Sequence, residues 1–254
     1  MPTVVLIFGS NHTKLCGVNH LLIAAQIVVF AASSLTNVLQ AAATAFEQQS
    51  GVQVLVNVGA SNSQARQIVE GAPADVFCSA DEAQMDVAEG AGKVVAGTRV
   101  KLALNQLVVV VPRSRARTFA RAADLLDASI VRIAVGNPAA VPVGVYTRAY
   151  LERAGLWARL ESKVIPALSA RAALAAVESH NADAAFVYAT DAAITANVAI
   201  AFRVPAADAP PIVYTAAITT GGANQVDGRR FLAFLRSAAG RALFGAAGFP
   251  LPPA

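Results

Sequence analysis

The chain has 254 residues, enough for one large domain or two domains of ordinary size with a proper hydrophobic core. Hydrophobic residues make up 56% of it and charged residues only 14%, which excludes an intrinsically disordered chain and favours a compact α/β fold. The net charge is +4, but the 20 lysines and arginines are scattered and form no basic run, so we expect no nucleic-acid partner.

Residues 1–26 do not fit the pattern of an ordinary secretory signal. The apolar run at residues 4–8 is short, and polar residues separate it from the next apolar run at residues 21–25. A signal peptide needs a basic start, a continuous apolar core and a small-residue cleavage site, in that order. We interpret residues 1–26 as an atypical leader or a poorly ordered N-terminus.

From Ile27 onward the pattern becomes regular. A short apolar strand at residues 27–30 leads into two adjacent serines, and a helix follows whose apolar residues recur at helical spacing from Leu35 to Phe46. Ser34 stands where an N-cap is expected. A helix start directly after a strand is a ready anion site, because unpaired N–H groups and the positive end of the helix dipole meet there.

The same arrangement recurs twice in the next fifty residues. A strand with alternating valines at residues 52–58 precedes Ser61, which with Gln64 matches a capping box for a helix at residues 64–70. A third strand at residues 74–79 is followed by Asp81 as the cap of a third helix. Strand, polar cap and helix in repetition indicate a mainly parallel sheet with helices outside.

A second series of similar elements follows in the rest of the chain. We expect, in order, a long buried strand at 104–112, a strand at 130–136, helices from 145 and from 169, a strand at 184–188 with Thr190 and Asp191 as the next cap, a strand at 212–218, and a helix pair at 228–248. The chain thus reads as two α/β lobes, one formed by residues 27–104 and 210–254 and the other by residues 105–209. Each lobe is expected to contain a mainly parallel sheet flanked by helices.

Polar groups gather at the ends of the predicted strands. Ligands of open parallel sheets bind beyond the carboxyl ends of the strands, so two such edges facing each other form a cleft. The residues at these strand ends or helix starts are Ser34, Ser61, Val143, Ala170 and Tyr188. The sequence therefore predicts a ligand site between the lobes.

From Ile27 to Phe249 the chain resembles the periplasmic molybdate-binding proteins of bacterial molybdate ABC transporters. The matching segments are Phe30-Ala-Ala-Ser-Ser-Leu-Thr-Asn37, Ala65-Arg-Gln-Ile68, Gly71-Ala-Pro-Ala-Asp-Val-Phe77, Ser79-Ala-Asp81, Val135-Gly-Asn-Pro138, Val141-Pro142 and Val187-Tyr-Ala-Thr-Asp-Ala192. Together these segments are specific, whereas any one of them alone is a weak signal.

The resemblance implies a two-lobed periplasmic-binding-protein fold that holds an oxyanion between the lobes. The family's two serines fall on Ser34 and Ser61, its tyrosine on Tyr188, and its backbone amide donors on Val143 and Ala170. It also implies a periplasmic or cell-surface location and a membrane permease of an ABC transporter as partner. We expect a monomer without a cofactor, in which molybdenum is held only as molybdate or tungstate by these same residues.

The implied ligands are all hydrogen-bond donors, and none is charged. Hydrogen bonds to a charged acceptor are roughly twice as strong as neutral ones, so several aimed donors can replace the hydration of an anion. A donor-only site suits a fully deprotonated oxyanion such as molybdate, tungstate or sulfate, because hydrogen phosphate carries a proton that needs an acceptor. A binding protein for another such oxyanion, or a ligand-sensing domain, remains an alternative.

A two-lobed α/β transferase is the less favoured rival. Ser34 or Ser61 would then be a nucleophile, but the sequence contains no Gly-x-Ser-x-Gly elbow, and no histidine occupies a plausible base position. The two cysteines make neither a disulfide framework nor a metal site, and Cys78 is expected to be a buried small residue. We therefore predict a binding protein and not an enzyme.

Overall fold

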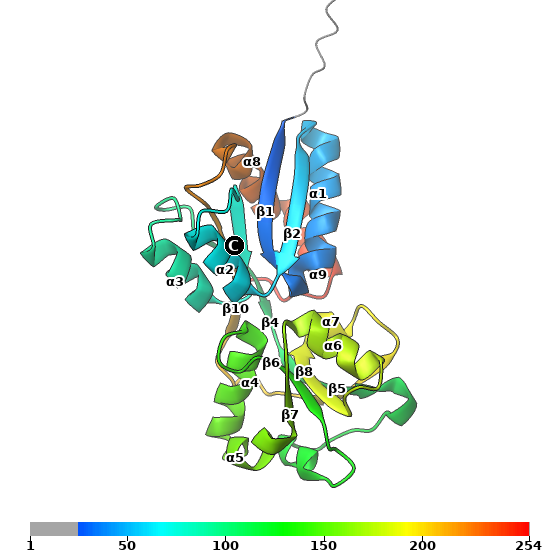
Figure 1. The fold of residues 1–254 in the computed structure, drawn as a ribbon. Coiled ribbons are helices and arrows are strands. Elements are labelled where there is room, and N and C mark those ends of the chain that lie inside the picture. Colours follow the sequence, from blue (N-terminus) through cyan, green and yellow to red (C-terminus); the bar gives the residue numbers. More distant parts are fainter. Residues whose placement is uncertain (1–24, 254) are drawn as a thin grey trace, which may run out of the picture.

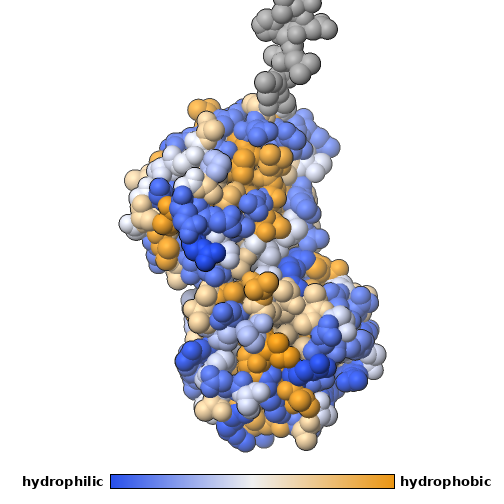
Figure 2. All heavy atoms as spheres, in the orientation of Figure 1, coloured by the Kyte–Doolittle hydropathy of each residue, from blue (hydrophilic) through white to orange (hydrophobic). Residues whose placement is uncertain are grey.

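The computed structural model describes residues 25–253. These residues form two five-stranded sheets, each flanked by helices, and Figure 1 shows them as two lobes stacked end to end. Figure 2 shows the narrower waist where the lobes meet. The expectation of a two-lobed α/β fold is confirmed, whereas the atypical leader was proposed for a segment that lies almost wholly outside the described residues.

The first lobe contains the sheet with strand order β2-β1-β3-β10-β4. Its strands are β1 (Gln26–Ala32), β2 (Gln53–Gly59), β3 (Val76–Ser79), β4 (Val100–Asn105) and β10 (Ile212–Ile218). Its helices are the 3-10 helix η1 (Ser33–Leu35), α1 (Thr36–Ser50), α2 (Ser61–Val69), α3 (Glu82–Gly90), α8 (Gln225–Arg236) and α9 (Ala238–Ala246).

The second lobe contains the sheet with strand order β7-β6-β8-β5-β9. Its strands are β5 (Leu107–Pro112), β6 (Ile133–Gly136), β7 (Val164–Ala167), β8 (Ala184–Tyr188) and β9 (Val198–Arg203). Its helices are α4 (Pro142–Arg153), α5 (Trp157–Leu160), α6 (Ala170–Glu178) and α7 (Ala189–Ala192), with 3-10 helices η2 (Arg113–Arg115), η3 (Ala122–Leu126) and η4 (Glu161–Lys163).

Both sheets are mainly parallel, as expected, but each also contains one strand that runs against the other four. β10 pairs antiparallel with β3 and β4, and β5 pairs antiparallel with β8 and β9. The expected single strand at residues 104–112 is in fact two strands, because β4 ends at Asn105 in the first sheet and β5 begins at Leu107 in the second. β5 and β10 are the strands by which the chain enters each sheet from the other lobe. They start at the waist, whereas β1, β2, β6 and β8 end there, so the pairing is antiparallel.

Several local expectations are confirmed by the backbone. Gly51 ends α1 with a φ of 71°, in the left-handed region that favours glycine. The Asp81 side chain caps α3 by accepting a hydrogen bond from Gln84 N at 2.9 Å. Cys78 is fully buried on β3, and burial raises the pKa of its thiol to about 12. Gly51 and Asp81 thus mark one end each of α1 and α3, and Cys78 belongs to the core of the first lobe.

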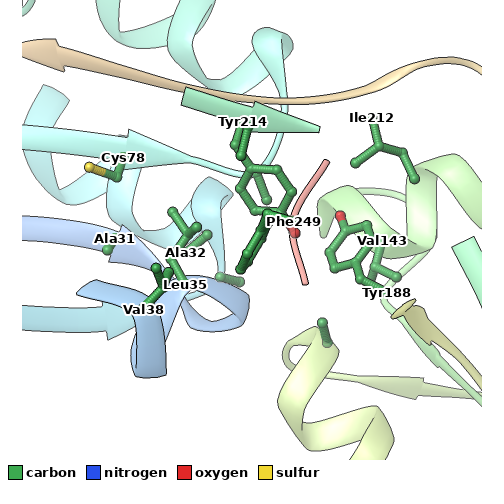
Figure 3. Packing of buried hydrophobic residues seen from close by; sticks show 14 of the residues in the cluster. Ala31, Ala32, Leu35, Val38, Cys78, Val143, Tyr188, Ile212, Tyr214 and Phe249 are labelled. Carbon is green, nitrogen blue, oxygen red and sulfur yellow. The ribbon is translucent and has the colours of Figure 1, made fainter. Parts of the chain in front are cut away.

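The last two helices hold the C-terminal segment against the first lobe. The rings of Phe46 on α1 and Phe231 on α8 pack edge to face with centroids 5.2 Å apart. Beyond α9, the carbonyl of Pro250 accepts a hydrogen bond from Leu104 N at 2.7 Å. The ring of Phe249 packs edge to face on Tyr214 of β10, as Figure 3 shows, so the chain end supports a strand that reaches the waist.

Candidate functional site

Ser34 lies just beyond β1, and the structure corrects its expected role as an N-cap. It is the middle residue of the 3-10 helix η1, and the N-cap of α1 is Leu35, without a side-chain hydrogen bond. The Ser34 side chain instead faces the waist, where its Oγ accepts a hydrogen bond from the Tyr214 hydroxyl at 3.0 Å. Ser34 is only 3% exposed, and its hydroxyl contacts a tyrosine of the distant strand β10 instead of capping the helix.

Ser61 is the first residue of α2, so the expected capping box with Gln64 is wrong. Ala60 is the N-cap and makes no side-chain hydrogen bond. The Ser61 Oγ accepts a hydrogen bond from Ala80 N at 3.0 Å, in the turn that follows β3. The hydroxyl thus ties two neighbouring strand ends together and keeps its own hydrogen available for another acceptor.

The second lobe presents backbone amides at two helix starts. α4 begins with Pro142, so Val143 is its second residue, and α6 begins with Ala170 after the cap Ser169, whose Oγ accepts a hydrogen bond from Ala172 N at 3.1 Å. The first N–H groups of a helix have no intrahelical acceptor and point out of its N-terminus. Both amides therefore offer donors that need a partner.

Tyr188 ends β8 and supplies the third hydroxyl. Its ring packs edge to face on Tyr214 across the waist at 5.8 Å, and Figure 3 shows it beside Val143. The Tyr188 Oη is buried, and among the described residues it has no hydrogen-bond partner. Burial raises the pKa of Tyr188 well above its ordinary value, so its hydroxyl keeps its proton and can donate.

These five predicted residues line one small cavity between the lobes. The complete lining is Ala32, Ser33, Ser34, Gly59, Ala60, Ser61, Ala80, Val141, Pro142, Val143, Ala170 and Tyr188. None of these lining residues carries an acidic or basic side chain. The starts of α2, α4 and α6 meet at this cavity, and each contributes the positive end of its dipole. The arrangement is chemically fitted to accept a small anion through neutral donors.

Sequence reasoning missed two groups next to the cavity. Tyr214 and Asn105 lie behind Ser34, and the Asn105 Nδ2 donates to the Tyr214 Oη at 3.2 Å. Both residues lie in apolar strand patterns that the sequence analysis recognised, but their pairing depends on β4 and β10 being neighbours. That pairing joins residues about a hundred positions apart, and no local signal marks it.

The second missed group is an ion pair of the second lobe whose arginine also bonds to the first lobe beside the cavity. Arg171 Nε lies 2.7 Å from Asp191 Oδ1 in the second lobe, and Arg171 Nη2 donates to Asn37 Oδ1 of the first lobe at 2.9 Å. Thr190 and Asp191 were expected to cap a helix, but both lie inside α7. Burial raises the pKa of Asp191 to about 6, so above that pH the carboxylate is charged and holds the guanidinium.

The described part of the chain contains neither a cluster of metal-ligand side chains nor a membrane-spanning helix. Residues 25–253 contain no group of three or more histidine, cysteine, aspartate or glutamate side chains placed to hold a metal ion. No helix within this range has the length and apolar character needed to cross a membrane.

Comparison with known proteins gives consistent matches over the same region. A family model described as bacterial extracellular solute-binding protein matches residues 27–250. The molybdate-binding protein ModA of Escherichia coli is 35% identical over 232 residues, covering 89% of each chain. ModA of Haemophilus influenzae is 32% identical, covering 89% of this chain and 90% of its own. The solved structure of the periplasmic molybdate-binding protein of Azotobacter vinelandii superposes with a TM-score of 0.81 at 28% identity, covering 89% of this chain and 100% of that one.

Proposed function

The chain belongs to the family of bacterial extracellular solute-binding proteins, and from this premise we propose that it binds molybdate, or tungstate, outside the cytoplasm and delivers it to an ABC importer. One observation carries the proposal. The hydroxyls of Ser34, Ser61 and Tyr188 line the same buried cavity as Val143 and Ala170, which begin helices. The ModA relatives from two organisms support the choice of molybdate as the ligand.

The physical chemistry of the cavity supports a proton-free dianion. Hydrogen bonds to a charged acceptor are roughly twice as strong as neutral ones, and three helix N-termini add positive potential at the same point. A cavity that offers only donors stabilises every oxygen of molybdate, tungstate or sulfate. Hydrogen phosphate would bring a hydroxyl group that needs an acceptor, and the lining supplies no carboxylate for it.

The donors come from both lobes, so we propose that ligand draws the lobes together. We divide the chain at the two crossings of the waist, with residues 27–104 and 210–254 in one body and residues 105–209 in the other. Neither body alone completes the donor set. Small-angle scattering should give a smaller radius of gyration with molybdate than without it, and equal radii would contradict closure on the ligand.

The same donor set can bind an anion but offers no group for catalysis, so we propose that the protein is not an enzyme. We also propose that it acts as a monomeric carrier and that its partner is the membrane permease. Among residues 25–253 neither serine contacts a base: the hydroxyl of Ser61 contacts a backbone amide, and that of Ser34 contacts a tyrosine whose pKa burial raises. A two-lobed transferase would need an activated nucleophile. Turnover of an activated ester or phosphoryl donor at the cavity would contradict this proposal.

The ligand itself can be identified directly. Native mass spectrometry of protein purified without added anion should show a mass increase that matches molybdate or tungstate. Calorimetry with molybdate, tungstate, sulfate and hydrogen phosphate should then rank the first two far above sulfate and show no binding of hydrogen phosphate. Tighter binding of sulfate than of molybdate would overturn the assignment and favour the alternative of a sulfate carrier.

A further inference from the structure

A chain of hydrogen bonds runs from the waist crossing to the cavity. Asn105, the last residue of β4, donates from Nδ2 to the Tyr214 Oη at 3.2 Å, and the Tyr214 hydroxyl lies 3.0 Å from the Ser34 Oγ. The other Nδ2 hydrogen of Asn105 goes to the Thr190 Oγ1 at 2.8 Å, across the waist. Ser34 and Tyr214 are both buried, with Tyr214 fully so, which shields their hydrogen bond from bulk solvent.

The direction of this chain is fixed at its far end. The Asn105 Oδ1 accepts a hydrogen bond from Gln106 N at 2.9 Å, and a backbone N–H can only donate. The amide of Asn105 is therefore oriented with Nδ2 toward Tyr214. The Tyr214 oxygen accepts the hydrogen bond from Asn105, so the Tyr214 hydroxyl donates its own hydrogen to the Ser34 Oγ. The Ser34 hydroxyl then has its hydrogen free to donate into the cavity.

We propose that Tyr214, oriented by Asn105, is a positioning residue that makes Ser34 a hydrogen-bond donor to the bound anion. Tyr214 is not among the residues that line the cavity and acts through the Ser34 hydroxyl. This inference rests on the proposed function, since it needs an anion in the cavity. It explains why the Ser34 hydroxyl, which could both donate and accept, serves only as a donor to that anion.

Ser61 shows the same device in a simpler form. Its Oγ accepts a hydrogen bond from Ala80 N, so a backbone amide fixes the direction of its hydroxyl without any side-chain relay. In the described structure the Ser34 Oγ accepts no hydrogen bond from a backbone amide and accepts one from the Tyr214 hydroxyl instead. A substitution of Tyr214 can therefore free the Ser34 hydroxyl to rotate, whereas no substitution except proline removes the amide that orients Ser61.

The test is a double-mutant cycle on molybdate affinity. Tyr214→Phe keeps the ring that packs on Tyr188 and Phe249 and removes only the hydroxyl. We expect it to weaken molybdate binding about tenfold, the effect of losing part of one hydrogen bond to a charged acceptor. In a Ser34→Ala background the same substitution should change affinity by less than about twofold, because coupled residues are not additive.

A tenfold effect that persists in the Ser34→Ala background would overturn the relay and make Tyr214 a purely structural residue. Tyr150→Phe is the matched control, since Tyr150 is a buried tyrosine of α4 that does not line the cavity, and its affinity should equal that of wild type. If Tyr214→Phe does not fold, Asn105→Ala replaces it in the cycle, and its effect on affinity should be smaller in the Ser34→Ala background but not absent, because Asn105 also bonds Thr190 across the waist. Wild-type protein that binds no molybdate would reject the proposed function together with the relay, whereas additive variants of a molybdate-binding wild type would reject the relay alone.

Discussion

The two faces of the cavity use different chemistry. The first lobe contributes two side-chain hydroxyls, Ser34 and Ser61, each held by a hydrogen bond from a neighbouring strand or turn. The second lobe contributes backbone amides at the starts of α4 and α6, together with Tyr188, whose hydroxyl has no partner among the described residues. One face therefore depends on the identity of its side chains, and the other depends mainly on where its helices begin.

The two faces therefore constrain the sequence differently. A hydroxyl donor disappears with the side chain, so Ser34 and Ser61 are recognisable in the sequence as serines at strand ends. A backbone donor survives almost any substitution except proline, so the residue types at Val143 and Ala170 carry little information about the site. The following changes test the contrast between the two faces.

The largest effect is expected from a negative charge on the first face. Ser61→Asp keeps an acceptor for the Ala80 amide and places a carboxylate at the start of α2, where the helix dipole favours it. Folding should therefore survive. The carboxylate would repel a dianion, and each pair of unit charges at ~4 Å costs about 4 kcal/mol at an effective dielectric of ~20. Calorimetry should detect no molybdate binding to a variant with an intact thermal transition, and near wild-type affinity would contradict a site at Ser61.

Removing the same hydroxyl should weaken binding without abolishing it. Ser61→Ala deletes one donor, and a hydrogen bond to a charged group is worth about 1.5–3 kcal/mol, so affinity should fall roughly 10- to 150-fold. The Ala80 amide would also lose its partner, which should lower the free energy of unfolding by about 1–3 kcal/mol. Calorimetry and denaturant unfolding measure the two effects, with Ser179→Ala, an exposed serine at the end of α6, as the control.

The second face can be tested by removing a backbone donor. Ala170 is the first residue of α6, a position where proline is tolerated, and Ser169 before it is extended with φ −163° and ψ 172°, away from the helical region that a following proline disfavours. Ala170→Pro should therefore keep the melting temperature within a few degrees of wild type. It should weaken molybdate binding about tenfold or more, because it deletes one N–H donor to a charged acceptor.

Ala170→Gly is the matched control, because it changes the side chain and keeps the amide. Its molybdate affinity should stay within about twofold of wild type, a difference of roughly 0.4 kcal/mol. Equal weakening by the glycine and proline variants would mean that the Ala170 side chain, not its N–H group, matters. Unchanged affinity in both would remove Ala170 from the donor set and leave Val143 as the amide of the second face.

The same contrast explains how far the sequence could predict the structure. The strands at 184–188 and 212–218 were predicted with the bounds of β8 and β10, because short apolar runs between polar turns are strong local signals. The five predicted donors were brought to one cavity because each follows a strand or begins a helix. Their binding role stays a prediction.

What the sequence could not predict depends on contacts between distant segments. Ser34 and Ser61 looked like N-caps because their local pattern is that of a cap, but Tyr214 and Ala80 bind their oxygens instead. The split of residues 104–112 into β4 and β5 was missed, because an apolar run gives no sign that it changes sheets at Asn105. At both serines, tertiary hydrogen bonds overrode the local preference for capping.

The smallest effect is expected outside the cavity, where a side-chain contact joins the two faces. Asn37 on α1 accepts a hydrogen bond from Arg171 on α6, which directly follows the proposed donor Ala170. Asp191 forms an ion pair with the same guanidinium. Asn37→Ala removes this contact without touching the donor set. Hydrogen bonds of exposed charged groups contribute about 0.5–1 kcal/mol, so the lobes should open about two- to fivefold faster and molybdate should dissociate by the same factor. Release of radiolabelled molybdate into excess tungstate measures this rate. Asn181→Ala is the control, because Asn181 is exposed and its side chain bonds to Ser179 within its own lobe. An unchanged release rate in Asn37→Ala would mean that the donors around the anion alone hold the lobes closed, so that the two faces meet only through their ligand.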